Sequence, residues 1–138
     1  MLKDAFVITK VFASNTEVVD TAIFTCPEGA EYEVTEVMEE HTTLGTNGSA
    51  VTMDVVKAAS GTAVAGATTL LQSTFNMKST VDTPVRKTVA NSGLVTARGT
   101  RTLTAGQKLG LDFTGTLTAL AGVCVTVVLR LRRPALNR

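Results

Sequence analysis

The sequence predicts an all-β protein: an eight-stranded two-sheet β-sandwich, jelly-roll-like, forming a single domain over residues 1–138. Three observations lead to this prediction. The chain contains 24 Thr and 18 Val, and β-branched side chains fit a pleated sheet better than a helix. Several stretches alternate between apolar and polar residues with the period of two that is typical of strands. Short breakers rich in Gly, Pro and Asn separate these stretches, as in sandwiches and barrels.

Four strands are predicted in the first half of the chain. Ala5–Phe12 is rich in β-branched and aromatic residues, and Val18–Thr25 ends at a Pro-Glu-Gly breaker. The apolar residues of Glu31–Thr42 fit either a strand with a bulge or a short helix, and the surrounding β pattern favours the bulged strand. An Asn-Gly pair at 47–48 precedes the fourth strand, Val51–Lys57, and predicts a tight hairpin between the third and fourth strands.

The second half begins with a loop and continues with four more strands. Small residues and two glycines at 58–67 predict the loop. Leu70–Met77 is an ambiguous fifth strand whose start also fits a helical turn, and Val85–Ala97 is a sixth, interrupted by Asn-Ser-Gly. Lys108–Thr114 alternates cleanly. Gly122–Arg133 alternates most clearly, with five aliphatic residues on one face, which predicts a strand lying on the core.

The charges are divided unevenly along the chain. Residues 1–69 carry ten acidic residues and three lysines, a net charge of −7, whereas residues 70–138 carry +8, so the whole chain is +1. In the jelly-roll order the third strand lies beside the eighth and the sixth, and cross-strand opposite charges contribute ~0.2–1 kcal/mol per pair. We therefore expect an acidic residue of 31–40 to lie near Arg130 or Arg132. The alternatives are a solvated acidic strand, or charged halves that face opposite ways and mediate association between copies.

No pattern in the chain indicates catalysis, a cofactor or a metal. His41 lies beside Glu39 and Glu40 without a nucleophile motif such as G-x-S-x-G, which predicts a surface histidine. Cys26 and Cys124 do not have the spacing of metal ligands and are expected to be free thiols. Neither a calcium loop nor a phosphate-binding motif occurs. We expect no enzymatic activity, no cofactor and no metal site.

The partner predicted from the residues is a protein, not a membrane or a nucleic acid. No run of 18 apolar residues occurs, and charged residues interrupt the start before a secretory signal can form. The arginines near the end lack the interleaved aromatic residues of a nucleic-acid surface, so an acidic protein surface or a solvated strand end fits them better. The predicted contact residues are Arg130, Arg132, Arg133, Arg138 and Lys3.

Residues 103–127 carry a resemblance to a known family. They combine an L-x-A-G-Q-x-L-x-L-D hairpin, a loop of Thr, Gly and Leu at 114–122, and a final aliphatic strand. This pattern resembles the C-terminal half of small β-sandwich virion proteins of tailed bacteriophages, most of all capsid decoration (cement) proteins. The resemblance is strongest over 103–132 and looser elsewhere. Its motifs are structural, so no functional residue is carried over.

The resemblance implies a decoration protein on the outside of the assembled head. Such proteins are commonly homotrimers that stabilise the shell by bridging subunits of the major capsid protein, and they assemble in the host cytoplasm. The two termini, Met1–Ala5 and Pro134–Arg138, are then candidates for shell contact. One alternative is a tail, fibre or head-fibre component that recognises a host surface with loops 58–69 and 114–122. A major shell jelly roll of a small virus, and a cellular enzyme or ligand-binding sandwich, are further alternatives.

Overall fold

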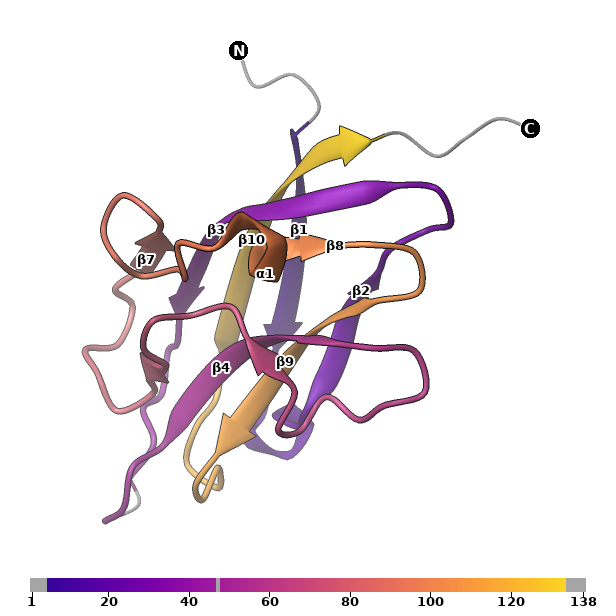
Figure 1. Ribbon diagram of the computed structural model, residues 1–138. Helices are drawn as coiled ribbons and strands as arrows, with labels where there is room; N and C mark the ends of the chain where they lie inside the picture. Colours follow the sequence, from indigo (N-terminus) through magenta and orange to yellow (C-terminus); the bar gives the residue numbers. More distant parts are fainter. Residues whose placement is uncertain (1–4, 47, 134–138) are drawn as a thin grey trace.

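Two antiparallel sheets packed face to face make up the protein (Figure 1). The computed structural model describes residues 5–46 and 48–133. Sheet A contains β1 (Ala5–Phe12), β10 (Val123–Arg133), β3 (Glu31–Glu40) and β7 (Val85–Thr88) in that order, with β8 (Thr102–Leu103) also paired to β3. Sheet B contains β2 (Thr21–Thr25), β9 (Lys108–Thr114), β4 (Thr52–Ala58) and β5 (Thr68–Thr69), with β6 (Phe75–Asn76) also paired to β4. The two short helices are η1 (Asn15–Glu17) and α1 (Arg98–Arg101).

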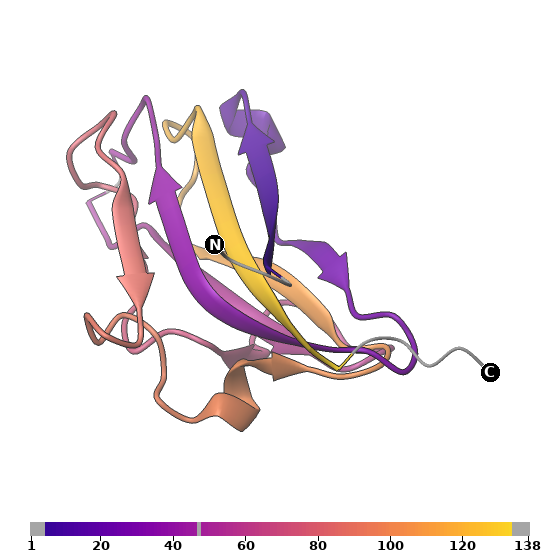
Figure 2. The ribbon, with the colours of Figure 1, turned by 90° about the horizontal axis from the view of Figure 1, so that it is seen from above.

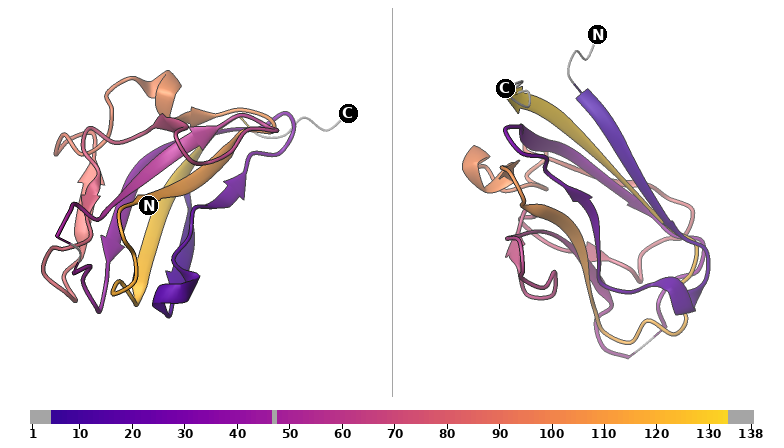
Figure 3. Two further views of the ribbon diagram at one scale, coloured as in Figure 1. Left: turned by 90° about the horizontal axis from the view of Figure 1, so that it is seen from below. Right: turned by 90° about the vertical axis from the view of Figure 1, so that its right-hand side faces the viewer.

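The predicted all-β two-sheet sandwich is confirmed, and so is its strand order. The third predicted strand lies between the eighth and the sixth, as the jelly-roll arrangement requires. The two layers are visible when the molecule is turned (Figure 2; Figure 3). Two strands of two residues each, β5 and β8, add to the eight that were predicted.

The core lies between the sheets and is filled by alternate residues of the central strands. In β10 the valines at 123, 125 and 127 and Leu129 are fully buried, and they face Leu109 and Leu111 of β9 across the sandwich. Phe12 and Phe113 join the two sheets edge to face, with their ring centroids 5.5 Å apart. The aliphatic residues of the last strand therefore lie on the core, as their alternation predicts.

Strand β3 contains the predicted bulge, and the helical alternative is wrong. Val34 pairs with Leu129 and Glu36 pairs with Val128, so Thr35 is the extra residue in the register. A bulge of this kind changes which alternate side chains face inward. Both Val34 and Val37 are buried as a result, although they are three positions apart, an odd spacing that would place them on opposite faces of a regular strand.

The predicted hairpin between the third and fourth strands is wrong, because β3 and β4 belong to different sheets. The connection crosses from sheet A to sheet B and is held from both sides. Thr43 forms a bridge with Ala121, and the Gly45 amide donates to the Met77 carbonyl at 2.9 Å. Asn-Gly favours a tight turn locally, but these tertiary contacts fix the crossing. Asn47 lies outside the described residues.

The sixth strand is shorter than predicted. It ends at Thr88, because the Asn91 side chain closes a turn there. Its Oδ1 accepts from the Thr88 amide at 2.8 Å and its Nδ2 donates to the Arg86 carbonyl at 2.8 Å. The chain then continues through a loop to α1, which has no counterpart in the prediction.

Candidate functional site

The two outer faces of the sandwich differ, and sheet B is covered by its own chain. The loop between β4 and β5 folds over β9. A methyl group on Gly110 would lie 2.6 Å from Val64, so the valine packs directly onto the glycine. The Gly66 amide donates to the Asp112 carboxylate at 2.9 Å. These contacts fix the predicted loop 58–67 on the sheet.

The outer face of sheet A is open over the described residues. Val7 and Val11 of β1 are 59% and 56% exposed, the highest values among the exposed large hydrophobic residues of the described chain. Each outward residue of β1 has an outward partner on β10. Together they form the β1–β10 stripe, defined as Val7, Thr9, Val11, Cys124, Thr126 and Val128.

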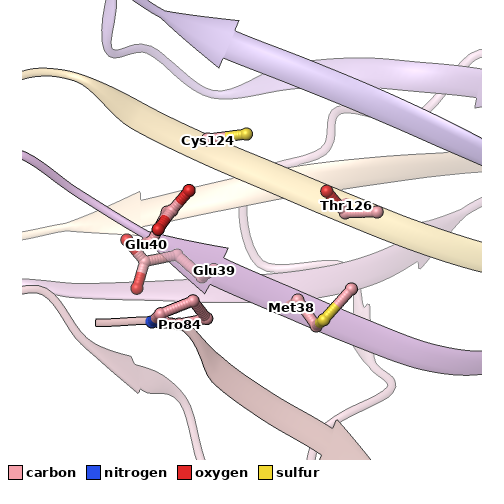
Figure 4. A pocket seen from close by; sticks show the side chains of 6 residues that line it. All are labelled: Met38, Glu39, Glu40, Pro84, Cys124 and Thr126. Atoms are coloured by element: carbon pink, nitrogen blue, oxygen red, sulfur yellow. The ribbon is translucent and has the colours of Figure 1, made fainter. Parts of the chain in front are cut away.

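A small hollow of about 130 Å³ adjoins this stripe (Figure 4). Cys124 and Thr126 form one side, Met38 and Glu40 of β3 lie beside them, and Pro84 just before β7 closes the other side. The hollow therefore lies on the outer face of sheet A, between β10, β3 and β7.

Two charged residues, Arg130 and Glu40, lie at opposite ends of this face, while Glu33, in register with Arg130, is bound by Arg101 and Arg132. Arg130 is exposed, two residues beyond Val128, whereas Glu40 pairs in register with Cys124 at the opposite end. The six residues from 124 to 130 span about 20 Å at ~3.3 Å per residue. Neither Arg130 nor Glu40 forms an ion pair within 5–46 and 48–133, whereas Glu36 and Arg86 pair with each other.

A largely buried ion cluster lies where β3 meets the last strand. Glu33 Oε2 lies 2.6 Å from Nη1 of Arg101, and Glu33 Oε1 lies 3.6 Å from Nη1 of Arg132. Arg101 also donates from Nε to the Val95 carbonyl at 2.8 Å and from Nη1 to the Val34 carbonyl at 3.0 Å. The expected approach of the acidic third strand to the arginines of the last one is confirmed, and this carboxylate is not solvated. Arg101 was not among the predicted residues.

The five predicted contact residues do not lie on one surface of the described chain. Arg130 is exposed on the outer face of sheet A, whereas Arg132 is partly engaged by the buried cluster. Arg133 ends β10 opposite Glu31 in register. Lys3 and Arg138 lie outside the described residues, as do the terminal segments predicted to touch a shell, except for Ala5 at the start of β1.

The prediction of a surface histidine is wrong. His41 and Glu39 are each 1% exposed, and Nδ1 of His41 lies 2.8 Å from Oε1 of Glu39. Nε2 lies 3.2 Å from the Ser79 carbonyl, and the His41 carbonyl accepts from the Asp82 amide at 2.8 Å. Burial raises the pKa of Glu39, which the hydrogen bond from His41 partly opposes. The pair holds the segment after β6 against β3.

Two lysines also make contacts that hold parts of the fold together. Nζ of Lys57 donates to the carbonyls of Gly99 and Thr102 at 2.9 and 3.0 Å and so holds α1. Nζ of Lys87 lies 5.0 Å from the ring centroid of Phe75, a cation–π distance. Burial lowers the pKa of both lysines.

Both cysteines are free, as predicted: Cys26 is buried and Cys124 is half-buried. Within the described ranges no three His, Cys, Asp or Glu residues lie close enough together to hold a metal ion. No helix in the same part of the chain is both long and apolar enough to cross a bilayer. No protein-family model matches the chain, and no curated protein matches it.

Proposed function

We propose that this protein is a structural component of a bacteriophage virion: a capsid decoration (cement) protein that binds the outer head surface and bridges subunits of the major capsid protein. The open outer face of sheet A carries the proposal. Apolar residues gathered on one exposed face of a protein mark a contact surface. Val7 and Val11, the two most exposed large hydrophobic residues of the described chain, lie on this face, and over residues 5–46 and 48–133 the loop 58–67 packs on the opposite sheet.

The resemblance supplies the specific role. Residues 103–127, which carry it, include the end of β8, all of β9, the loop that follows and the start of β10. Strand β9 lies between β2 and β4, and β10 lies between β1 and β3. The similar residues therefore build the centre of each sheet, which supports a shared framework with the virion proteins.

Decoration needs a stiff body more than a reactive site. Many copies on one shell add modest contact free energies that avidity multiplies. The buried cluster around Glu33, the His41–Glu39 pair and Lys57 all fix connecting segments to the sheets. In this proposal the protein assembles in the host cytoplasm and forms homo-oligomers on the capsid exterior, and the resemblance implies trimers.

The direct test is binding to undecorated heads. Purified protein is added to heads that lack decoration, and co-sedimentation and heat resistance of the heads are measured. We expect saturable binding and a higher temperature of DNA release. The double variant Lys3→Glu/Arg138→Glu tests the predicted terminal contacts, and Lys78→Glu/Arg98→Glu is its charge-matched control. Absence of both binding and stabilisation by the unaltered protein would refute the proposal.

A fibre or tail component that recognises a host remains the second candidate, and the fold weighs against it. Its predicted recognition loop at 58–69 is packed onto sheet B through Val64 and Gly66. A recognition loop normally projects freely from the scaffold. Binding to host cells or to a glycan array, without binding to heads, would favour the fibre role instead.

A further inference from the structure

We infer that the outer face of sheet A is a self-association surface, through which two copies of this chain pack face to face about a two-fold axis. The sheet A face is defined as the β1–β10 stripe together with Met38, Glu40, Pro84 and Arg130. The inference rests on the same face that carries the proposed capsid contact, but it concerns the free protein in solution and has its own readout. The occupant is therefore a second copy, and three features of the face favour it.

The first feature is that β1 is protected against pairing at its edge. It borders sheet A, and such edges can pair with another chain. Lys10, however, shares the inward side of β1 with Ile8 and Phe12, and its Nζ lies 5.1 Å from the Phe12 ring centroid. An inward-pointing lysine on an edge strand is a known device against edge-to-edge association. Association of this sheet therefore uses its face.

The second feature is that the face is complementary to itself. Arg130 lies at one end of the stripe and Glu40 at the other. The other acidic residues of this side are already paired, Glu36 with Arg86, and Glu33 with Arg101 and Arg132. Turning a second copy over about an axis that crosses the strands reverses their direction. Arg130 of each copy then lies over the Glu40 end of the other, so the same ion pair forms twice, as in an isologous contact.

The apolar residues follow the same rotation. Val7 and Val11 lie at opposite ends of the outward side of β1, so each faces the other residue of the second copy. The hollow beside Glu40 lies at the end to which Arg130 of the second copy is brought. Its volume of about 130 Å³ gives the guanidinium a place next to the carboxylate.

The third feature is the size of the face, which sets the expected strength. Four strands at ~4.8 Å spacing and about seven residues at ~3.3 Å give a flat footprint of roughly 300–400 Å². Stable complexes bury about 800 Å² per partner. We therefore expect a weak pair that forms at high concentration, with a dissociation constant in the micromolar range or above.

Charge reversal tests both the face and its symmetry. Sedimentation equilibrium over a concentration series gives the mass of the unaltered protein, of Glu40→Arg and of Arg130→Glu. Each single variant brings like charges together twice, so its dissociation constant should rise at least tenfold. An equimolar mixture of the two should associate again, because both contacts then join opposite charges. Arg98→Glu is the matched control on another surface, and thermal melts verify that every variant is folded.

Each possible result either supports or overturns the self-association inference. A concentration-dependent pair that the single variants weaken and the mixture restores supports the inference. A monomer at every concentration, a trimer, or a pair that neither variant weakens would overturn it. Mixtures that stay monomeric would overturn the two-fold arrangement. Binding to heads can succeed or fail in any of these cases, so failure of this inference is distinguishable from failure of the capsid role.

Discussion

The proton held between His41 and Glu39 should make stability depend on pH. A neutral imidazole has one N–H donor, yet both ring nitrogens of His41 face acceptors: the Glu39 carboxylate at 2.8 Å and the Ser79 carbonyl at 3.2 Å. If His41 is neutral and Glu39 is ionised, only one of these two contacts can be a hydrogen bond. Forming both requires one additional proton on the pair. This proton is either on the imidazole or on the carboxyl group.

Replacing Glu39 by Gln should remove the need for this proton. The amide of Glu39→Gln can donate to Nδ1, which leaves the Nε2 proton for the Ser79 carbonyl. His41→Ala instead leaves the buried carboxylate without its partner, and breaking a buried pair in this way costs about 3–5 kcal/mol. We expect the alanine variant to be strongly destabilised at neutral pH, and less so in acid, where Glu39 is protonated.

The sign of the pH dependence follows from the raised pKa of Glu39. A carboxyl group whose pKa is higher in the folded protein stabilises it fully below the unfolded value, here 4.5, and this contribution is lost as the pH rises through the folded pKa. The free energy of unfolding of the unaltered protein should therefore fall above pH 4.5, and that of Glu39→Gln should lack this fall.

Urea denaturation across a pH series measures both curves. Glu28→Gln is the control, because Glu28 is exposed and its loss should leave the curve within a few tenths of a kcal/mol. The neighbouring Glu40 and Asp82 are unchanged in every variant. Parallel curves for the unaltered protein and Glu39→Gln would refute the reasoning about the shared proton.

Three further predictions concern packing and thiols. Arg101→Met should lower the free energy of unfolding by about 3–5 kcal/mol, because Glu33 then stays buried without its closest partner; a loss below ~1 kcal/mol in urea would contradict this. Gly110→Ala should cost about 1–3 kcal/mol by overpacking against Val64, and adding Val64→Ala should recover part of it. One thiol per folded chain, Cys124, should react with a disulfide reagent. The buried Cys26, whose pKa burial raises, should react only on unfolding.

The sequence predicted the parts of the fold that local patterns determine. The alternation of Gly122–Arg133 identified a strand on the core, and the charge division placed an acidic residue beside Arg132. Both signals act between neighbouring strands, where side-chain alternation and opposite charges directly determine the pairing. The open face of sheet A could not be recognised in this way, because every strand has an outward side and only the folded chain shows which one its loops cover.

The burial of His41 could have been found from the bulge. A bulge that turns both Val34 and Val37 inward also turns the residues two and four positions after Val37 inward, which are Glu39 and His41. Their polarity argued for the surface, since charged side chains are rarely buried without partners. Arg101 gave no comparable signal, because its contact with Glu33 joins segments 68 residues apart through a loop of irregular path.

The buried polar groups determine where this protein can recognise another. Arg101 fixes the segment before β8 to β3, Lys57 fixes α1 to sheet B, and His41 fixes the turn after β6. Each contact satisfies a polar or charged side chain with a group from a distant part of the chain, so losing it leaves that side chain without its partner. Loops tied down in this way do not adapt to a partner. Recognition then falls to the strands, and in the part of the chain that the structure describes the loop 58–67 packs on the outer face of sheet B, whereas the outer face of sheet A carries the exposed Val7 and Val11.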